Sequence, residues 1–145
     1  MRLALAILLL FSVVLANAGE VIVSLDYHHS MRIVNSHVRI VIDSEGILAL
    51  TAESRGKDKA TTRLKIPGER VQQLKRELEG IDWQKVSADK STGLDGTTVR
   101  ISIGKQSASL WSPDYDSKKR GLVRMQKLIE SILAAAGRDQ YGMPK

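Results

Sequence analysis

Apolar and polar residues alternate along the segment 37–43, HVRIVID, and this period constrains the fold more than any other feature of the chain. Its residues Val38, Ile40 and Ile42 fall on one side of an extended chain, because successive side chains of a strand point to opposite faces. His37, Arg39 and Asp43 then lie on the other side. This alternation predicts a half-buried strand of an antiparallel sheet.

Other segments share this strand character, and short polar turns separate some of them. The turn at 43–46, DSEG, places a glycine where a positive φ is tolerated. Alternation or β-branched runs predict strands at 21–25, 37–44, 47–54, 60–66, 96–103 and 107–111. The sequence therefore predicts a sheet of five or six strands.

The apolar period changes to that of a helix in two places. In 68–80, apolar residues recur every three or four positions after Pro67, which costs little in a first helical turn, and Gly80 gives a C-terminal stop. A longer stripe runs through 122–133, with Asp114 and Asp116 as candidate N-terminal caps. The segment between the first helix and the next strand has the composition of a surface loop.

The predicted order is β-β-β-β-α-β-β-α, which lacks the regular βαβ alternation of parallel sheets. It indicates an α+β fold whose antiparallel sheet carries both helices on one face. The other face is expected to be open and basic. Its expected cationic side chains are Arg39, Arg63, Lys65 and Arg100.

Two segments, VRIVIDSEGILAL and VRISIGKQSASLW, share the opening VRI-x-I and a following strand pattern. Each precedes a predicted helix. A duplicated strand-strand-helix unit would explain this echo, and so would two ordinary hairpins.

The N-terminal segment 1–18 has the pattern of a cleavable secretory signal. Arg2 precedes an apolar run that is too short for a comfortable membrane span, and Ala16 and Ala18 are the small residues of a cleavage site. Cleavage is expected between Ala18 and Gly19, with an uncleaved anchor as the alternative. The protein is then expected in the periplasm or outside the cell.

The rest of the chain is expected to form a single α+β domain, 19–137, followed by a flexible polar tail, 138–145. The chain has no cysteine, so an exported domain of this kind must be stabilised by packing without disulfides. The whole chain, including the segment 1–18, has a formal net charge of +6. Outside the cytoplasm, a basic surface favours an acidic protein or an anionic envelope polymer over nucleic acid as a partner.

A candidate contact patch follows the last predicted strand. Trp111 and Tyr115 lie beside the cationic triplet Lys118, Lys119 and Arg120. Trp, Tyr and Arg are enriched where protein interfaces concentrate their binding energy, and cations in a first helical turn oppose the helix dipole. The alternative is that Trp111 belongs to the core and the triplet is a solvated helix entry.

All three histidines of the chain lie in one short segment and suggest a metal site. The candidate ligands are His28, His29 and His37, with Asp26 as an oxygen donor. His28 and His29 point to opposite sides of an extended chain, and no ligand spacing here is diagnostic. Polar surface histidines are the simpler interpretation.

Catalytic motifs are sparse. Cysteine chemistry is excluded, no serine lies in a Gly-x-Ser-x-Gly turn, and STGLDG lacks the lysine and the spacing of a phosphate-binding loop. Turns and helix caps explain the carboxylates in predicted loops better than a catalytic pair does, namely Asp89, Asp95, Asp114 and Asp116.

These observations favour a small exported binding module, without cofactor or catalysis, that engages an acidic protein or an anionic envelope polymer. An inhibitor or immunity protein for a secreted enzyme would fit this description. Two alternatives remain open from the sequence. One is a metal-binding protein or hydrolase built on the histidine cluster, and the other is a structural envelope factor that self-associates through an open sheet edge.

Overall fold

The computed structural model describes residues 19–57 and 59–145, and the predicted secretory signal lies outside them. These residues form a six-stranded antiparallel sheet and three helices, which confirms the predicted α+β class. The strands are β1 (Val21–His29), β2 (His37–Asp43), β3 (Ile47–Glu53), β4 (Ala60–Lys65), β5 (Thr97–Ile103) and β6 (Gln106–Trp111). The helices are α2 (Gly68–Glu79), α3 (Trp83–Ala88) and α4 (Val123–Ala135).

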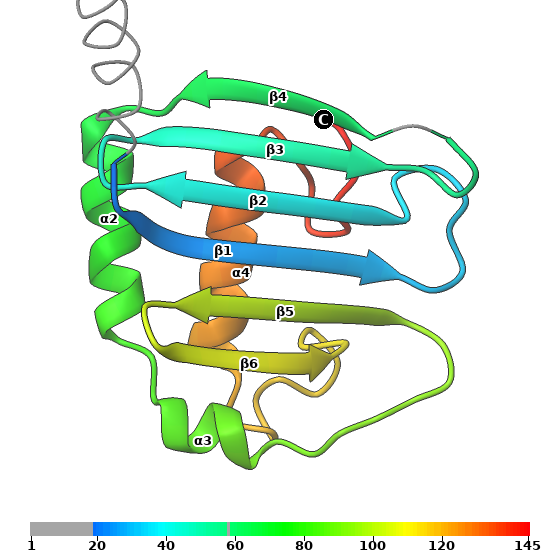
Figure 1. Ribbon diagram of the computed structural model, residues 1–145. Coiled ribbons are helices and arrows are strands. Elements are labelled where there is room, and N and C mark those ends of the chain that lie inside the picture. The colour runs from blue at the N-terminus through cyan, green and yellow to red at the C-terminus, as the bar shows by residue number, and fades with distance from the viewer. Residues whose placement is uncertain (1–18, 58) are drawn as a thin grey trace, which may run out of the picture.

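The strands lie in the order β4-β3-β2-β1-β5-β6, and every neighbouring pair is antiparallel. Strands β1 to β4 form a meander, and the β5–β6 hairpin pairs with the free side of β1. In Figure 1, α2 and α4 lie behind the sheet, while no helix of the described residues lies on its front face. The strand β1 is therefore central, and its outward side chains have neighbours on both sides.

The core lies between the sheet and the two long helices. In β2 the alternating residues Val38, Ile40 and Ile42 are all fully buried, as their period predicts. The buried side chains of α4 come from the predicted stripe, namely Met125, Leu128, Ile129, Ile132 and Leu133. Replacing one such leucine or isoleucine with alanine costs about 2–5 kcal/mol in a typical core.

The short helix α3 was not predicted, since 84–96 was expected to be a loop. It begins after Asp82, whose carboxylate accepts a hydrogen bond from the backbone N–H of Lys85 at 3.2 Å. The helix buries Val86 alone. A helix of six residues with one buried residue is too short to show a helical period, which is why the sequence pattern misses it.

The helix α4 begins later than predicted, so Asp114 and Asp116 do not cap it. Residues 113–121 form turns instead. Asp116 has φ of 52° and Gly121 has φ of 71°, and both values lie outside the right-handed helical region. Among the described residues, no helix has the length and apolar character that crossing a membrane requires.

The last eight residues, expected to be a flexible tail, fold back onto the domain. The buried side chain of Arg138 donates hydrogen bonds to the Asn35 side-chain oxygen and to the Gly142 carbonyl. Gly142 lies so close to the Tyr27 ring that an added Cβ would be 3.2 Å from it. These long-range contacts hold the segment in place, and polar composition alone gives no sign of them.

Candidate functional site

The front face of the sheet brings together two groups of residues that the sequence suggested separately, the basic strand residues and most of the histidine cluster. Arg39 on β2 and Arg100 on β5 are the cross-strand neighbours of Asp26 on β1. Directly opposed side chains in an antiparallel sheet lie within interaction range. The central carboxylate of this face therefore has an arginine on each side.

The two arginines also occupy equivalent positions in the two VRI-x-I segments. Arg39 follows Val38 in β2, and Arg100 follows Val99 in β5. Both strands pair with β1, one on each side. The shared VRI-x-I pattern thus places one arginine on each side of β1, whether it arose by duplication or not.

The acidic residues of the front face are engaged with other side chains. The Asp26 carboxylate lies 3.1 Å from Nε2 of His37, and Nδ1 of that ring lies 3.7 Å from the Glu53 carboxylate. The same Glu53 oxygen lies 3.3 Å from the Lys59 ammonium. Within the described residues, neither Arg39 nor Arg100 takes part in an ion pair or a side-chain hydrogen bond.

A shallow hollow lies over the centre of this face, and all of its lining residues come from β1, β2 and β5. They are Asp26, His28, His37, Arg39, Thr98 and Arg100. Two guanidinium groups, two imidazoles and one carboxylate line this small depression. Such a lining suits a ligand that presents carboxylate or phosphate oxygens, which arginine binds through two parallel hydrogen bonds.

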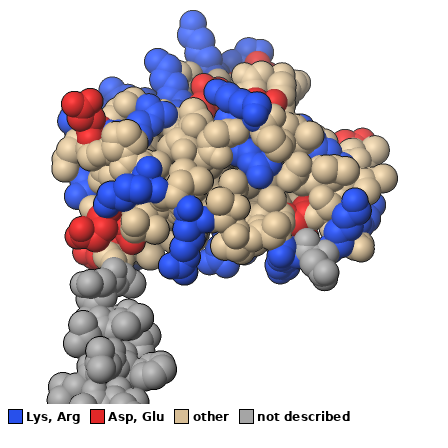
Figure 2. Space-filling model, turned by 90° about the horizontal axis from the view of Figure 1, so that it is seen from above, with Lys and Arg blue, Asp and Glu red and all other residues tan. Residues whose placement is uncertain are grey.

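The remaining basic residues of this face lie on the edge strand β4. Arg63 is opposite Ala49, and Lys65 is opposite Ile47. The Lys65 ammonium donates a hydrogen bond to the Glu45 carbonyl, whereas Arg63 has no side-chain partner among the described residues. Seen over the β4 edge, the surface shows more Lys and Arg than Asp and Glu side chains (Figure 2).

The histidines do not form the metal cluster that the sequence suggested. His28 and His37 share the front face, with ring centroids 6.2 Å apart. His29 pairs with the buried Thr97 and so points toward the helix side of the sheet. No group of three or more potential protein ligands arranged for a metal ion is found within 19–57 and 59–145.

The environment of His29 lowers the pKa of its imidazole, first because the ring is partly removed from water and then because Arg32 and His28 are close. These influences all disfavour the charged imidazolium. His29 therefore belongs to the packing at the end of β1 and takes no part in the front-face group.

Trp111, at the end of β6, lies opposite Thr98 and so belongs to the front face. Its indole N–H donates to the Asp95 carbonyl at 3.0 Å, and a Cβ added at Gly93 would lie 2.2 Å from the indole ring. The connection before β5 therefore packs directly onto the indole. Tyr115 is exposed and contacts Trp111 edge to face, with ring centroids 5.9 Å apart.

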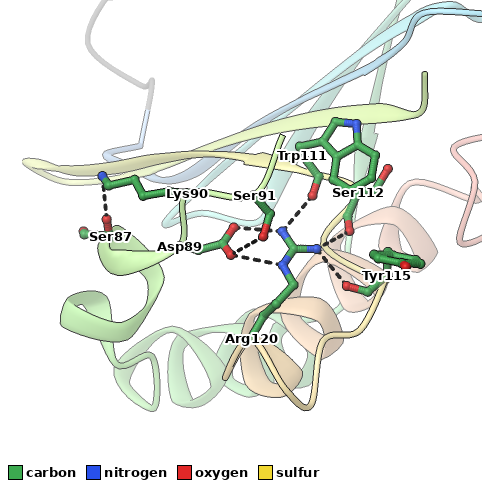
Figure 3. Close-up of polar contacts among 8 residues, drawn as sticks. All are labelled: Ser87, Asp89, Lys90, Ser91, Trp111, Ser112, Tyr115 and Arg120. Atoms are coloured by element: carbon green, nitrogen blue, oxygen red, sulfur yellow. Dashed lines mark hydrogen bonds and ion pairs between the residues drawn. The ribbon is translucent and has the colours of Figure 1, made fainter. Parts of the chain in front are cut away.

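Arg120 differs most from the expected contact patch, because its guanidinium lies inside the fold (Figure 3). The side chains of Arg120 and Asp89 are only 10% and 5% exposed, and the two groups lie 2.8 Å apart. Both carboxylate oxygens of Asp89 accept from the guanidinium. The group also donates to the carbonyls of Trp111, Ser112 and Tyr115.

This arrangement joins three segments that are far apart in the sequence: the end of α3, the end of β6 and the turns before α4. The Arg120 guanidinium lowers the pKa of the Asp89 carboxyl through its hydrogen bonds, and Ser91 lowers it further. Lys118 and Lys119 remain exposed, and the Lys119 ammonium lies 3.6 Å from the Asp116 carboxylate. Of the predicted triplet, only the two lysines are therefore surface cations.

Sequence reasoning missed the Asp89–Arg120 pair, although both residues were noted individually. Each has ordinary alternatives in its own neighbourhood, a turn for Asp89 and a helix entry for Arg120. No local pattern links two residues on separate connections. The pairing depends entirely on the positions of α3, β6 and α4.

No family model matches the chain, and no curated protein matches its sequence. The geometry of the front face is therefore the basis for a functional proposal.

Proposed function

We propose that the protein is a non-catalytic binding module that holds an acidic protein on the front face of its sheet. One observation carries this proposal. Three arginines from three strands, Arg39, Arg63 and Arg100, share a face that no helix covers, and none has a side-chain partner among the described residues. On the same face, the acidic residues Asp26 and Glu53 already lie against His37 and Lys59.

Arginines on neighbouring strands are spaced by the sheet itself, so the free protein already presents them in a fixed array. Preorganised donors lose less conformational entropy on binding than mobile ones do. Charge complementarity would speed the encounter, and bidentate arginine–carboxylate contacts would slow dissociation. A fixed array fits the defined surface of a folded acidic protein better than a flexible anionic polymer, which needs no particular spacing.

In this proposal the protein acts by occupying its partner, as an inhibitor or immunity protein for a secreted enzyme does. Export through the predicted signal at 1–18 would bring it to such a partner. The Asp26 carboxylate lies 3.1 Å from Nε2 of His37 and so orients the imidazole. Among the described residues, no serine or threonine hydroxyl is hydrogen-bonded to His37, so the pair lacks the nucleophile of a hydrolase.

The test is affinity capture with two charge-matched variants. Arg39→Glu with Arg100→Glu reverses the centre of the front face, while Arg76→Glu with Lys127→Glu makes the same charge change at exposed residues of α2 and α4. Each protein is immobilised, and envelope and secreted proteins are passed over it at low and moderate salt.

We expect the unmodified protein and the helix variant to retain a stoichiometric acidic protein at moderate salt. The face variant should bind that protein at least tenfold more weakly, because unpaired or reversed charges at an interface are costly. Equal losses in both variants would point to unspecific attraction for a polymer. Undiminished binding by the face variant would remove this face as the site.

A further inference from the structure

Three connections between secondary-structure elements meet at one end of the sheet, the right-hand end in Figure 1. Their described residues are 30–36, 54–57 and 89–96, and together these form a surface that we name the loop end. Backbone hydrogen bonds join them: Arg55 N–H donates to the Ile33 carbonyl at 2.8 Å, and Ser30 N–H donates to the Gly96 carbonyl at 3.2 Å. The loop end is therefore one surface and not three independent loops.

Large apolar side chains are concentrated on this surface. Met31 is 69% exposed, Ile33 is 65% exposed and Val34 is 53% exposed, while Leu94 on the neighbouring connection is 98% exposed. These four side chains are not part of the buried core. Large exposed apolar side chains concentrated on one surface are typical of an interaction surface in soluble domains.

The same surface carries positive charge. Arg32, Arg55 and Lys57 lie on its first two connections. The acidic residues described on the three connections are Asp95 and Asp89, and Asp89 is held by Arg120. The loop end thus combines protruding aliphatic side chains with an excess of cations.

We propose that the loop end docks on a membrane surface rich in anionic phospholipid. Aliphatic side chains at loop tips can enter the boundary between headgroups and acyl chains, and nearby Lys and Arg are attracted to anionic headgroups. Both properties are needed for stable attachment, and both are present here. The apolar anchors include Val34 and Leu94, and valine and leucine are under-represented among the residues that dominate protein interfaces.

This orientation leaves the front face available. The strands run from the opposite end of the sheet to the loop end, so a molecule docked by its loops presents the front face sideways. The membrane contact and the partner-binding face are separate surfaces with separate residues. Each can be tested without disturbing the other.

The absence of cysteine makes site-specific labelling straightforward. Ile33→Cys, Leu94→Cys and Val123→Cys each receive one environment-sensitive fluorophore, and Val123, at the start of α4, serves as the reference. The labelled proteins are mixed with vesicles of phosphatidylglycerol and phosphatidylethanolamine, or with vesicles of phosphatidylcholine alone. Every variant shares the same N-terminal segment, so the comparison between positions is independent of that segment.

We expect blue-shifted emission at positions 33 and 94 with the anionic vesicles, little change with phosphatidylcholine, and no change at 123. No shift at 33 and 94, or an equal shift at all three positions, would overturn the proposal. A shift at 33 that grows with protein concentration in the absence of vesicles would overturn it in favour of self-association.

A matched pair of substitutions gives an independent readout by vesicle sedimentation. Val34→Ser lies on the loop end and Val21→Ser at the opposite end of β1, and these valines are 53% and 51% exposed. The double variant Ile33→Ser with Val34→Ser should partition onto anionic vesicles at least tenfold more weakly than the unmodified protein. Val21→Ser alone should leave this partition unaltered. Equal behaviour of the two variants would contradict the proposal.

The face variant with Arg39→Glu and Arg100→Glu separates this proposal from the proposed function. It should lose capture of the acidic protein and keep the fluorescence shift at position 33. Loss of that shift in the face variant would assign the membrane contact to the front face and overturn docking by the loop end.

Discussion

Arg100 and Arg120 are both expected from the sequence to be surface cations, Arg100 on the open face of the sheet and Arg120 in the contact patch after the last strand. In the structure, Arg100 lies on an open sheet face without an ion-pair or hydrogen-bond partner among the described residues, while the side chain of Arg120 is nearly buried against Asp89. The first is free to bind another molecule, and the second is used to hold the fold together. The same side chain therefore has opposite roles, and the surrounding carboxylates and carbonyls decide which.

The largest effect should come from breaking the buried pair. Asp89→Ala leaves the guanidinium of Arg120 nearly buried without its carboxylate, and removing one member of a buried pair costs about 3–5 kcal/mol. We expect a clear fall in the free energy of unfolding, measured by urea denaturation. Arg100→Ala is the control and should change it by no more than about 0.5 kcal/mol.

Protonation of Asp89 at low pH should lower the free energy of unfolding in part as Asp89→Ala does. The pKa of Asp89 is lowered in the folded protein by its hydrogen bonds to Arg120, so below the usual carboxyl range of about 4 the unfolded chain binds the proton more readily. The stability from this group is complete above the unfolded pKa and is lost as pH falls through the folded pKa. Urea denaturation between about pH 6 and pH 2 should show a shallower decline for Asp89→Asn than for the unmodified protein. Parallel curves would assign the acid sensitivity to other groups.

On the front face the geometry of the cation should matter as well as its charge. Arg100→Lys keeps the positive charge and loses the bidentate fork, so the affinity for the captured partner should fall by about 1–2 kcal/mol. Stability should hardly change, because among the described residues Arg100 makes no ion pair or side-chain hydrogen bond that lysine would lose. Titration calorimetry measures the affinity, and an unchanged value would mean that Arg100 acts only through long-range attraction.

The smallest effect is expected at the edge patch. Tyr115→Ala removes the edge-to-face contact with Trp111, and such aromatic pairs contribute about 0.5–1.5 kcal/mol. Combined with Lys119→Glu, it should lower the thermal transition slightly and leave partner capture within about tenfold of normal. Complete loss of capture with an intact fold would move the binding site from the front face to this edge.

The histidine pair shows the limit of local reasoning in another way. Alternation along an extended chain already indicated that His28 and His29 point apart, and the structure agrees. It did not indicate that His37 would lie between Asp26 and Glu53. That position depends on the registers of β2 with β1 and with β3, which are set by the packing of the whole buried face.

By itself, the sequence determined most of the elements: the alternating strands, the helix over 68–79 and the apolar stripe of α4. These patterns are local, because each depends on how side chains repeat along one segment. The tertiary structure alone decided that the β5–β6 hairpin pairs with β1, that Arg120 turns inward to Asp89, and that 138–145 folds back onto Tyr27. Each of those outcomes joins residues distant in the chain, and burial selects such contacts only once the core has formed.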